Sequence, residues 1–310
     1  GIKCEPEQVI ITTGAKQGIS LIAKCLLNKN SKVLIEDPTN RNVVQIFSYH
    51  TRHITPIPVD EEGIQTELIP KNCAPTVIFV TPSHQFPMGG ILSIQRRLEL
   101  AEFARNTGCY IVEDDYDSEF RYKGQPINSL HELNREYVIY IGTFSKILFP
   151  SLRLGYMVLP FSLVDQCREW KRLADHHSNS INQLALARFI GNGEMERYIM
   201  KAKKLYFKRR NLLISLLNEL FPGKVKIYGA PAGMHIVAEF DSVNFSEDLI
   251  NRFKENGINV IPVESHAIIK GIHTHQIILG YAHLSPSMLE QGLLRLKSVL
   301  EKYQIEVTKK

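Results

Sequence analysis

Short apolar runs that alternate with helical stretches are the feature that most restricts the fold of this chain. Continuous apolar runs, unlike alternating ones, are typical of strands that are buried on both faces of a parallel sheet. The clearest runs are VIIT (9–12), KVLIE (32–36), TVIFV (76–80), CYIVE (109–113) and VIYIG (138–142). Helical stretches lie between them, and RLGYMVL (153–159) follows as a further run. The pattern predicts an α/β domain over residues 1–195 with a mostly parallel sheet.

A long helix is predicted next, over residues 194–220, because apolar residues recur there at helical spacing. The tripeptide Phe-Pro-Gly at 221–223 ends it. Strand and helical patterns then alternate again, up to a last predicted helix at 286–302. We therefore expect a smaller C-terminal α+β domain, which together with the connecting helix covers residues 196–310.

Composition restricts the class of protein and its compartment. The chain has 310 residues, 44% of them hydrophobic and 22% charged, which is typical of a globular protein with a real core. It contains no run of about 18 apolar residues and no signal peptide, so neither a transmembrane helix nor secretion is predicted. Five cysteines without a C-x-x-C pair favour a reducing cytoplasm over a disulfide scaffold or a zinc site. We expect no bound metal.

Two further features concern partners. The sequence starts at Gly1 rather than at a methionine and soon enters a strand, which indicates a fragment of a longer protein. The segment KAKKLYFKRR (201–210) contributes six basic residues to a net charge of +5. We interpret it as the solvated face of the long helix, in preference to a contact with a nucleic-acid backbone or a partner domain.

Polar stretches follow two of the predicted strands, and ligands of open α/β sheets bind beyond the carboxyl ends of strands. TTGAKQG (12–18) opens a helix, whose first N–H groups and dipole form a site for a phosphate. EDDYDSEF (113–120) brings four carboxylates together within its first five positions. They suit a divalent metal, a solvated loop, or one buried aspartate that faces a cationic ring nitrogen. In the last case Tyr116 would bond a phenolic oxygen.

A lysine among hydroxyl groups follows a third strand, in GTFSKILFPSLRLGY (142–156). A free lysine is protonated at neutral pH, and burial or cationic neighbours favour the neutral amine that forms a Schiff base. Thr143, Ser145 and Arg153 are suited to bind a phosphate, arginine through its planar fork. Pyridoxal 5′-phosphate needs a lysine such as Lys146, a carboxylate for its ring nitrogen, donors for its phosphate and a partner for its ring oxygen. This cofactor therefore satisfies the whole set.

The same stretches resemble a known family. GTFSKILFPSLRLGY resembles the S-x-S-K-x6-R-x-G signature of fold-type I aminotransferases, with Thr143 in place of the first serine. EDDYDSEFRY and TPSHQFPMGGILS are similar to the aminotransferase-like domain of MocR-type regulators, a GntR subfamily of bacterial transcription factors. The resemblance covers essentially the whole chain. It implies a fold-type I structure, a homodimer, and a DNA-binding winged helix-turn-helix domain that belongs to the parent protein and is absent from this chain.

The resemblance also implies roles for individual residues. Lys146 would form the internal aldimine, Asp114 would pair with the pyridine nitrogen, and Tyr116 would bond the ring oxygen. The implied phosphate ligands are Thr143, Ser145, Arg153 and the backbone of Ala15 and Lys16. Asn40 stands where a tyrosine commonly stacks on the cofactor.

Three departures from aminotransferases change the expected function. Phe86 stands where an asparagine contacts the ring oxygen, and Ile278 stands where an arginine binds the substrate carboxylate. His283 stands where regulators that sense a γ-amino acid have an arginine. An effector carboxylate is therefore expected to be bound differently. The candidate effector contacts are Arg41, His283, His84 and Gln85, of which the last two either approach the ring or support their loop.

Three functions are open at this point. The favoured one is a sensor that binds an amino-containing small molecule as an external aldimine and shifts a transcriptional regulator between states. The first alternative is a PLP-dependent aminotransferase, because every residue needed to hold the cofactor is present. The second is a sensor of the cofactor itself, because the arginine for a substrate carboxylate is missing. Sensing is favoured over catalysis, and the effector is not identified.

Overall fold

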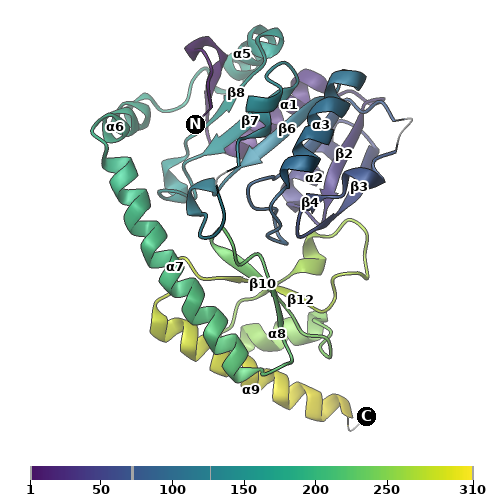
Figure 1. The fold of residues 1–310 in the computed structure, drawn as a ribbon, viewed down its shortest axis with the longest axis vertical. Coiled ribbons are helices and arrows are strands. Elements are labelled where there is room, and N and C mark those ends of the chain that lie inside the picture. Colours follow the sequence, from purple (N-terminus) through teal and green to yellow (C-terminus); the bar gives the residue numbers. More distant parts are fainter. Residues whose placement is uncertain (1, 71–72, 126, 309–310) are drawn as a thin grey trace.

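The computed structural model describes residues 2–70, 73–125 and 127–308, which form two sheets joined by a long helix (Figure 1). The large sheet contains β1 (Val9–Thr12), β2 (Lys32–Asp37), β3 (His53–Asp60), β4 (Gly63–Ile64), β5 (Val77–Val80), β6 (Tyr110–Asp115), β7 (Val138–Thr143) and β8 (Gly155–Val158). The small sheet contains β9 (Lys226–Tyr228), β10 (His235–Glu239), β11 (Ile261–Pro262) and β12 (Gln276–Gly280). The α-helices are α1 (Ala15–Leu26), α2 (Arg41–Ser48), α3 (Ile94–Thr107), α4 (Leu130–Leu133), α5 (Phe161–Asp175), α6 (Ser180–Gly191), α7 (Glu194–Leu220), α8 (Glu247–Glu255) and α9 (Pro286–Thr308).

The large sheet is mostly parallel, as the apolar runs predict. Its strand order is β1-β8-β7-β6-β5-β2-β3-β4. Parallel pairs join β3, β2, β5, β6 and β7, whereas β8 is antiparallel to both β1 and β7. Only residues 144–154 connect β7 to β8, which is too short for a crossover between parallel strands. The sequence pattern leaves β3, β4, α5 and α6 unassigned.

Helices cover both faces of the large sheet (Figure 1). One face packs on α1, α2 and α5, through the fully buried side chains of Ile22, Phe47 and Cys167. The other face packs on α3 and α4, through Leu100 and Leu130. Every residue of β5 and of β7 is buried, which explains why these strands read as continuous apolar runs.

The small sheet forms a second core with α7, α8 and α9, in which Leu217 and Phe253 are fully buried. Asp37, at the end of β2, links this core to the large sheet. Its carboxylate accepts hydrogen bonds from the backbone N–H groups of Ile268 and Ile269 at 2.6 and 2.9 Å. Within the described ranges, no helix is both long and apolar enough to cross a membrane.

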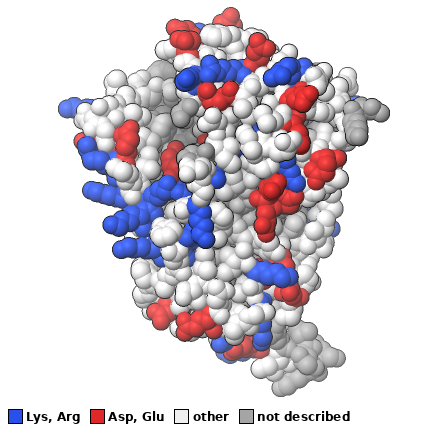
Figure 2. Space-filling view, viewed as in Figure 1, with Lys and Arg blue, Asp and Glu red and all other residues white. Residues whose placement is uncertain are grey.

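The helix α7 passes from one sheet to the other, with the bounds that its apolar spacing predicts. Lys and Arg side chains gather along it, at the left of Figure 2. Lys201, Lys204 and Lys208 are exposed, as expected of a solvated face. Arg210 departs from that expectation, because it is buried, with its guanidinium carbon 4.6 Å from the ring centroid of Phe207. The planar guanidinium stacks on this aromatic ring, and its Nη1 donates to the carbonyl oxygen of Ala230 at 2.7 Å, so Arg210 is not part of the solvated face.

Candidate functional site

Lys146 lies on the connection between β7 and β8, just beyond the carboxyl end of β7. Its neighbour Ile147 is buried and packs in one cluster with Leu154 and Leu186. These apolar contacts fix the backbone of the loop. The Lys146 side chain itself is exposed. The amine is therefore presented on a supported loop and remains open to a ligand.

Groups that bind anions lie beside this loop. Arg153, on the same connection, has a left-handed backbone with φ of 53°, and its Nη2 donates to the carbonyl oxygen of Thr13 at 2.6 Å. This contact holds the guanidinium at the N-terminus of α1, where a Cβ added to Gly14 would lie 3.4 Å from Nη1. Ser145 adds a buried hydroxyl that has no hydrogen-bond partner among the described residues. Because the first N–H groups of a helix lack intrahelical partners, the arrangement suits a phosphate group.

The other predicted phosphate ligands are found in the same place. Thr143 is buried at the end of β7, and its Oγ1 accepts from the backbone N–H of Ser145 at 3.2 Å. Ala15 and Lys16 form the first turn of α1, with Ala15 half-buried and Lys16 exposed. The structure thus brings the stretches 12–18 and 142–156 together, as the strand-end argument predicts.

Asp114, on β6, is a buried carboxylate without a partner. It is 9% exposed, and its Oδ1 has no hydrogen-bond partner among the described residues. Burial, together with the nearby charges of Asp115, Asp117 and Glu36, raises the pKa of Asp114 to about 7. Because β6 and β7 are parallel neighbours, Asp114 and the Lys146 loop lie at the same edge of the sheet. A cation placed against Oδ1 would offset the cost of burying this group.

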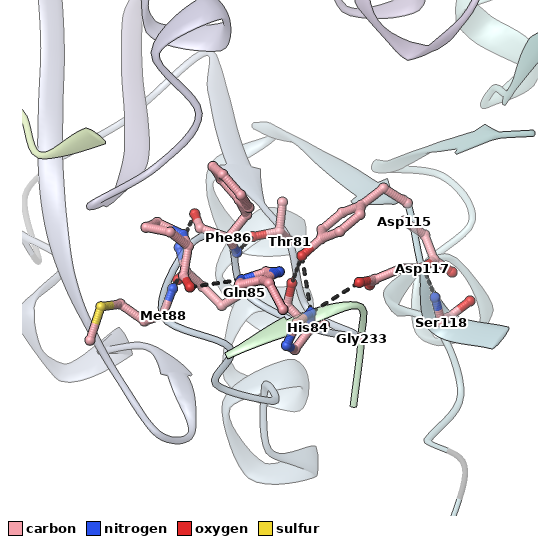
Figure 3. A network of polar contacts seen from close by, with 12 residues as sticks. Thr81, His84, Gln85, Phe86, Met88, Asp115, Asp117, Ser118 and Gly233 are labelled. Atoms are coloured by element: carbon pink, nitrogen blue, oxygen red, sulfur yellow. Dashed lines mark hydrogen bonds and ion pairs between the residues drawn. The ribbon is translucent and has the colours of Figure 1, made fainter. Parts of the chain in front are cut away.

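Tyr116 is bonded to the loop HQFP (84–87), whose His84 faces Asp117 in Figure 3. Its hydroxyl donates to the backbone carbonyl of His84 at 2.8 Å and lies 3.1 Å from His84 Nδ1. The carboxylate of Asp117 accepts from the same Nδ1 at 3.0 Å, and both of these side chains are fully buried. Desolvation and the charges of Asp117 and Asp114 raise the pKa of Tyr116 well above its ordinary value. The phenol therefore stays protonated, and its proton is donated to the His84 carbonyl oxygen. Toward a ligand, the Tyr116 oxygen can only accept a hydrogen bond.

Gln85 supports the same loop with both ends of its amide. Its Nε2 donates to the carbonyl oxygens of Pro38 and Phe86 at 2.8 and 2.9 Å and to Glu36 at 3.2 Å, while its Oε1 accepts from the backbone N–H of Met88 at 3.0 Å. Gln85 is fully buried. Of the two roles that the sequence leaves open, the structure shows the supporting one.

The small sheet completes the site with an aromatic cluster, formed by Phe86, Tyr116, His235 and His266. The ring centroid of Phe86 lies 4.9 Å from that of His266, 5.5 Å from that of His235 and 6.3 Å from that of Tyr116. His235, on β10, donates from Nε2 to the carbonyl oxygen of Pro87 at 2.9 Å. Burial, with the charges of His84 and Lys146, lowers the pKa of His235 to about 3, so its imidazole is neutral.

The remaining candidates lie at the rim. Asn40 is the N-cap of α2, and its Oδ1 accepts from the backbone N–H of Asn42 at 3.1 Å. Arg41 is exposed, and it lies close enough to His266 for its charge to add to the lowering of that residue's pKa by burial. His283 is exposed in the turn after β12. The structure therefore brings Arg41 toward the aromatic cluster and places His283 on the surface.

Two buried residues of the site escape the sequence argument. Glu36 ends an apolar strand, and its Oε2 accepts from the Thr81 hydroxyl at 2.6 Å. His235 is a polar residue inside the apolar stretch MHIVAEF. Asp117 belongs to the acidic stretch that the sequence singles out, but its contact with His84 does not follow from the sequence. The only signal for Glu36 and His235 is a single polar residue in or at the end of a buried strand. That signal does not say which other strand lies opposite.

Comparison with known proteins agrees with this geometry. The family model described as Aminotransferase class I and II, a family that typically depends on pyridoxal phosphate, matches residues 1–296. The chain is 39% identical over 300 residues to the uncharacterized HTH-type transcriptional regulator YdeL of Bacillus subtilis (strain 168), covering 96% of this chain and 64% of that protein. It is 32% identical to the probable rhizopine catabolism regulatory protein MocR of Rhizobium meliloti, covering 96% and 60%.

A solved structure with the same fold is that of LysN, the α-aminoadipate aminotransferase of Thermus thermophilus. It has a TM-score of 0.89 and 28% identity, and the match covers 96% of this chain and 78% of LysN. The chain spans less than two thirds of the length of the two regulators, whose C-terminal part it matches. The chain is thus similar to the C-terminal part of HTH-type transcriptional regulators, and it belongs to the class I and II aminotransferase family.

Proposed function

We propose that this chain is the effector-sensing part of a bacterial transcriptional regulator and that it binds pyridoxal 5′-phosphate at Lys146. In this proposal an amino-containing small molecule takes the place of Lys146 on the cofactor, as an external aldimine. DNA would be bound by a separate N-terminal domain of the parent protein. The proposal rests on one combination of features. The groups that would hold the cofactor are present, but the residues expected beside its ring oxygen (the ring-oxygen side) differ from those of an aminotransferase.

The residues present fit the cofactor. Asp114 Oδ1 and Ser145 Oγ are both buried and lack hydrogen-bond partners among the described residues, and a protonated ring nitrogen and a phosphate would supply them. Arg153, Thr143 and the first turn of α1 would hold the phosphate. When bound, the cofactor supplies an aldehyde carbon for Schiff-base formation and a ring that withdraws electrons from the ligand. The protein supplies the amine of Lys146 on a supported loop.

The ring-oxygen side favours retention of a ligand over its conversion. Phe86 has no hydrogen-bonding group where aminotransferases have an asparagine, and its ring packs among His235, His266 and Tyr116. The Tyr116 proton is used by the carbonyl of His84. Fewer side chains are therefore available to donate a hydrogen bond to the ring oxygen of the cofactor than in an aminotransferase. A catalytically active aminotransferase remains the alternative, because Lys146, Asp114 and the phosphate ligands are all in place.

We propose that the effector lies between the aromatic cluster and Lys146. Arg41 is the better placed candidate for an effector carboxylate, because its charge already acts on His266. His283 is the second candidate, since it follows β12, the strand that carries Ile278 in place of the usual arginine. The side chains of His84 and Gln85 are bonded to Asp117 and Glu36, so they would shape the pocket through their loop. A sensor of the cofactor alone would need neither Arg41 nor His283.

The test is an absorbance spectrum of the chain with pyridoxal phosphate, before and after each member of a panel of L- and D-amino acids and amines. A lysine-bound band that shifts with one ligand and then persists supports sensing. Decay to the pyridoxamine form, with release of a keto acid, indicates an aminotransferase. A band that no ligand moves favours a sensor of the cofactor itself. Lys146→Ala should abolish the band, whereas the matched surface variant Lys297→Ala should keep it.

We also propose that the chain pairs with a second copy. Ile181 and Leu184, on α6, are 77% and 72% exposed. Leu184 lines a cavity of about 960 Å³ that opens onto Val9 and Ile11 of β1, on the face of the sheet away from α1. Exposed apolar surface of this kind marks interfaces. Sedimentation should show a dimer that Leu184→Glu weakens and that Leu173→Glu, at a 61% exposed site on α5, leaves intact.

A further inference from the structure

We propose that Cys25 and Cys167 form an oxidisable dithiol, which a hydroperoxide converts into a reversible disulfide between α1 and α5. The two sulfur atoms are 3.1 Å apart, although the residues are separated by 142 positions in the sequence. A disulfide needs its sulfurs at about 2.05 Å, so a small side-chain movement brings them to bonding distance. This proposal does not depend on the cofactor or on the proposed function.

The backbone around the pair is held in register. The Nε2 of Gln166, the residue before Cys167, donates to the carbonyl oxygen of Cys25 at 3.2 Å. At the other end of the same two helices, Gln17 donates to Asp175 at 2.7 Å. The helices α1 and α5 are therefore joined near both ends, and the sulfurs face each other between fixed backbones. Such pre-alignment favours closure of the bridge over further oxidation of either thiol.

The two thiols are unequal, which assigns their roles. Cys167 is fully buried, whereas Cys25 is half-buried and is the one that an oxidant can reach. The contact between the two sulfurs lowers the pKa of Cys25 against the effect of burial, and together with burial it raises the pKa of Cys167. The thiolate is the nucleophile in such chemistry. Cys25 is therefore the attacking sulfur and Cys167 the resolving one.

The reaction balances with a hydroperoxide as the oxidant. The Cys25 thiolate attacks one peroxide oxygen, the O–O bond breaks, and the leaving hydroxide takes a proton to become water, which leaves a sulfenic acid. The Cys167 sulfur then attacks the Cys25 sulfur, the S–O bond breaks, and the second hydroxide leaves as water with the thiol proton. Two electrons pass from the two sulfurs to the peroxide. A thiol reductant reverses the bridge by exchange.

The pair is distinct from the other cysteines. Cys4, Cys73 and Cys109 are also free thiols, but the pair whose sulfurs share a hydrogen bond is Cys25 and Cys167. Cys4 is half-buried, like Cys25, but burial raises its pKa, and nearby Glu5 adds to that effect. Cys4 is therefore an internal reference, because it is accessible to solvent and has no hydrogen-bonded sulfur partner among the described residues.

The experiment treats the purified chain with one equivalent of hydrogen peroxide and maps its peptides without reduction. We expect a linked pair of peptides containing Cys25 and Cys167, an intact mass lower by two hydrogen atoms, and reversal by dithiothreitol. Cys4 should remain reduced at that dose. Cys167→Ser should leave Cys25 as a trappable sulfenic acid, and Cys4→Ser should still form the bridge. Oxidation of Cys4 before Cys25, or Cys25 sulfinic acid without the linked peptides, would overturn the proposal. The wild-type map decides this even if a cysteine variant fails to fold.

Discussion

Replacing Glu36 with glutamine tests how the carboxyl group behind the site is held. Glu36 is fully buried, and its Oε2 accepts from the backbone N–H and the hydroxyl of Thr81 at 3.1 and 2.6 Å and from Gln85 at 3.2 Å. Its Oε1 has no partner among the described residues, so this is the oxygen that is free to carry an acid proton. Glutamine keeps the accepting oxygen and the shape of the side chain, and it removes the ionisation.

The expected magnitude follows from the pKa. Burial raises the pKa of Glu36 from 4.5 to about 7, against the effect of its three hydrogen bonds. The folded protein therefore binds this proton more tightly than the unfolded chain does. The stabilisation is fully present below pH 4.5, declines as the pH rises toward 7, and is lost above pH 7. At about 1.36 kcal/mol per pKa unit, the wild type loses roughly 2–3 kcal/mol between about pH 5 and pH 8 from this group.

Urea unfolding of both proteins at the two pH values measures the effect. Glu113 also has a pKa raised to about 7, but it titrates in both proteins and cancels in the difference. The pKa of Asp114 is raised in part by the charge of Glu36, so it is lower in the variant and adds to the difference in the same direction. We expect the stability of Glu36→Gln, relative to wild type, to rise by roughly 2–3 kcal/mol from pH 5 to pH 8. Glu255→Gln, at an exposed site on α8, is the control and should show no such change. A difference that does not vary with pH would refute the reasoning, because it would mean that Glu36 is ionised at both pH values.

Three further predictions concern the cofactor and the sheet. Asp114→Asn removes a charge-assisted contact of about 1.5–3 kcal/mol, so it should weaken the binding of pyridoxal phosphate roughly 10- to 150-fold in an absorbance titration. An unchanged affinity would exclude Asp114 as the partner of the ring nitrogen. Arg153→Lys keeps the charge and loses the planar fork, so binding of pyridoxal phosphate should fall about tenfold while binding of unphosphorylated pyridoxal stays the same. Gly142→Ala would drive its Cβ into the Tyr156 ring and should cost about 1–3 kcal/mol in urea unfolding, whereas Gly191→Ala, which meets nothing within 4 Å, should be near neutral.

The local parts of the site could be predicted because each depends on a short stretch of sequence. The strand β7 is buried along its whole length, so it reads as one apolar run, and the lysine stands out where that run ends. The start of α1 is marked in the same way by the end of β1. Where the chain turns back without a helix, as it does between β7 and β8, the pattern gives the strand but not its direction.

The contacts that define the ring-oxygen side could not be predicted, because they join segments remote in sequence. His235 bonds the backbone of Pro87 across 148 positions. This contact depends on how the small sheet rests against the large one. Gln85 is similar, since its supporting role becomes visible only when β2 is placed beside β5.

The lysine and the arginine of the site lie on a single hairpin, between β7 and β8, whereas His235 and His266 belong to the part of the chain that carries the small sheet. The two sides of the site are therefore positioned by different parts of the chain. The distance between them depends on how the two sheets are held together, to which the hydrogen bonds from Ile268 and Ile269 to Asp37 contribute.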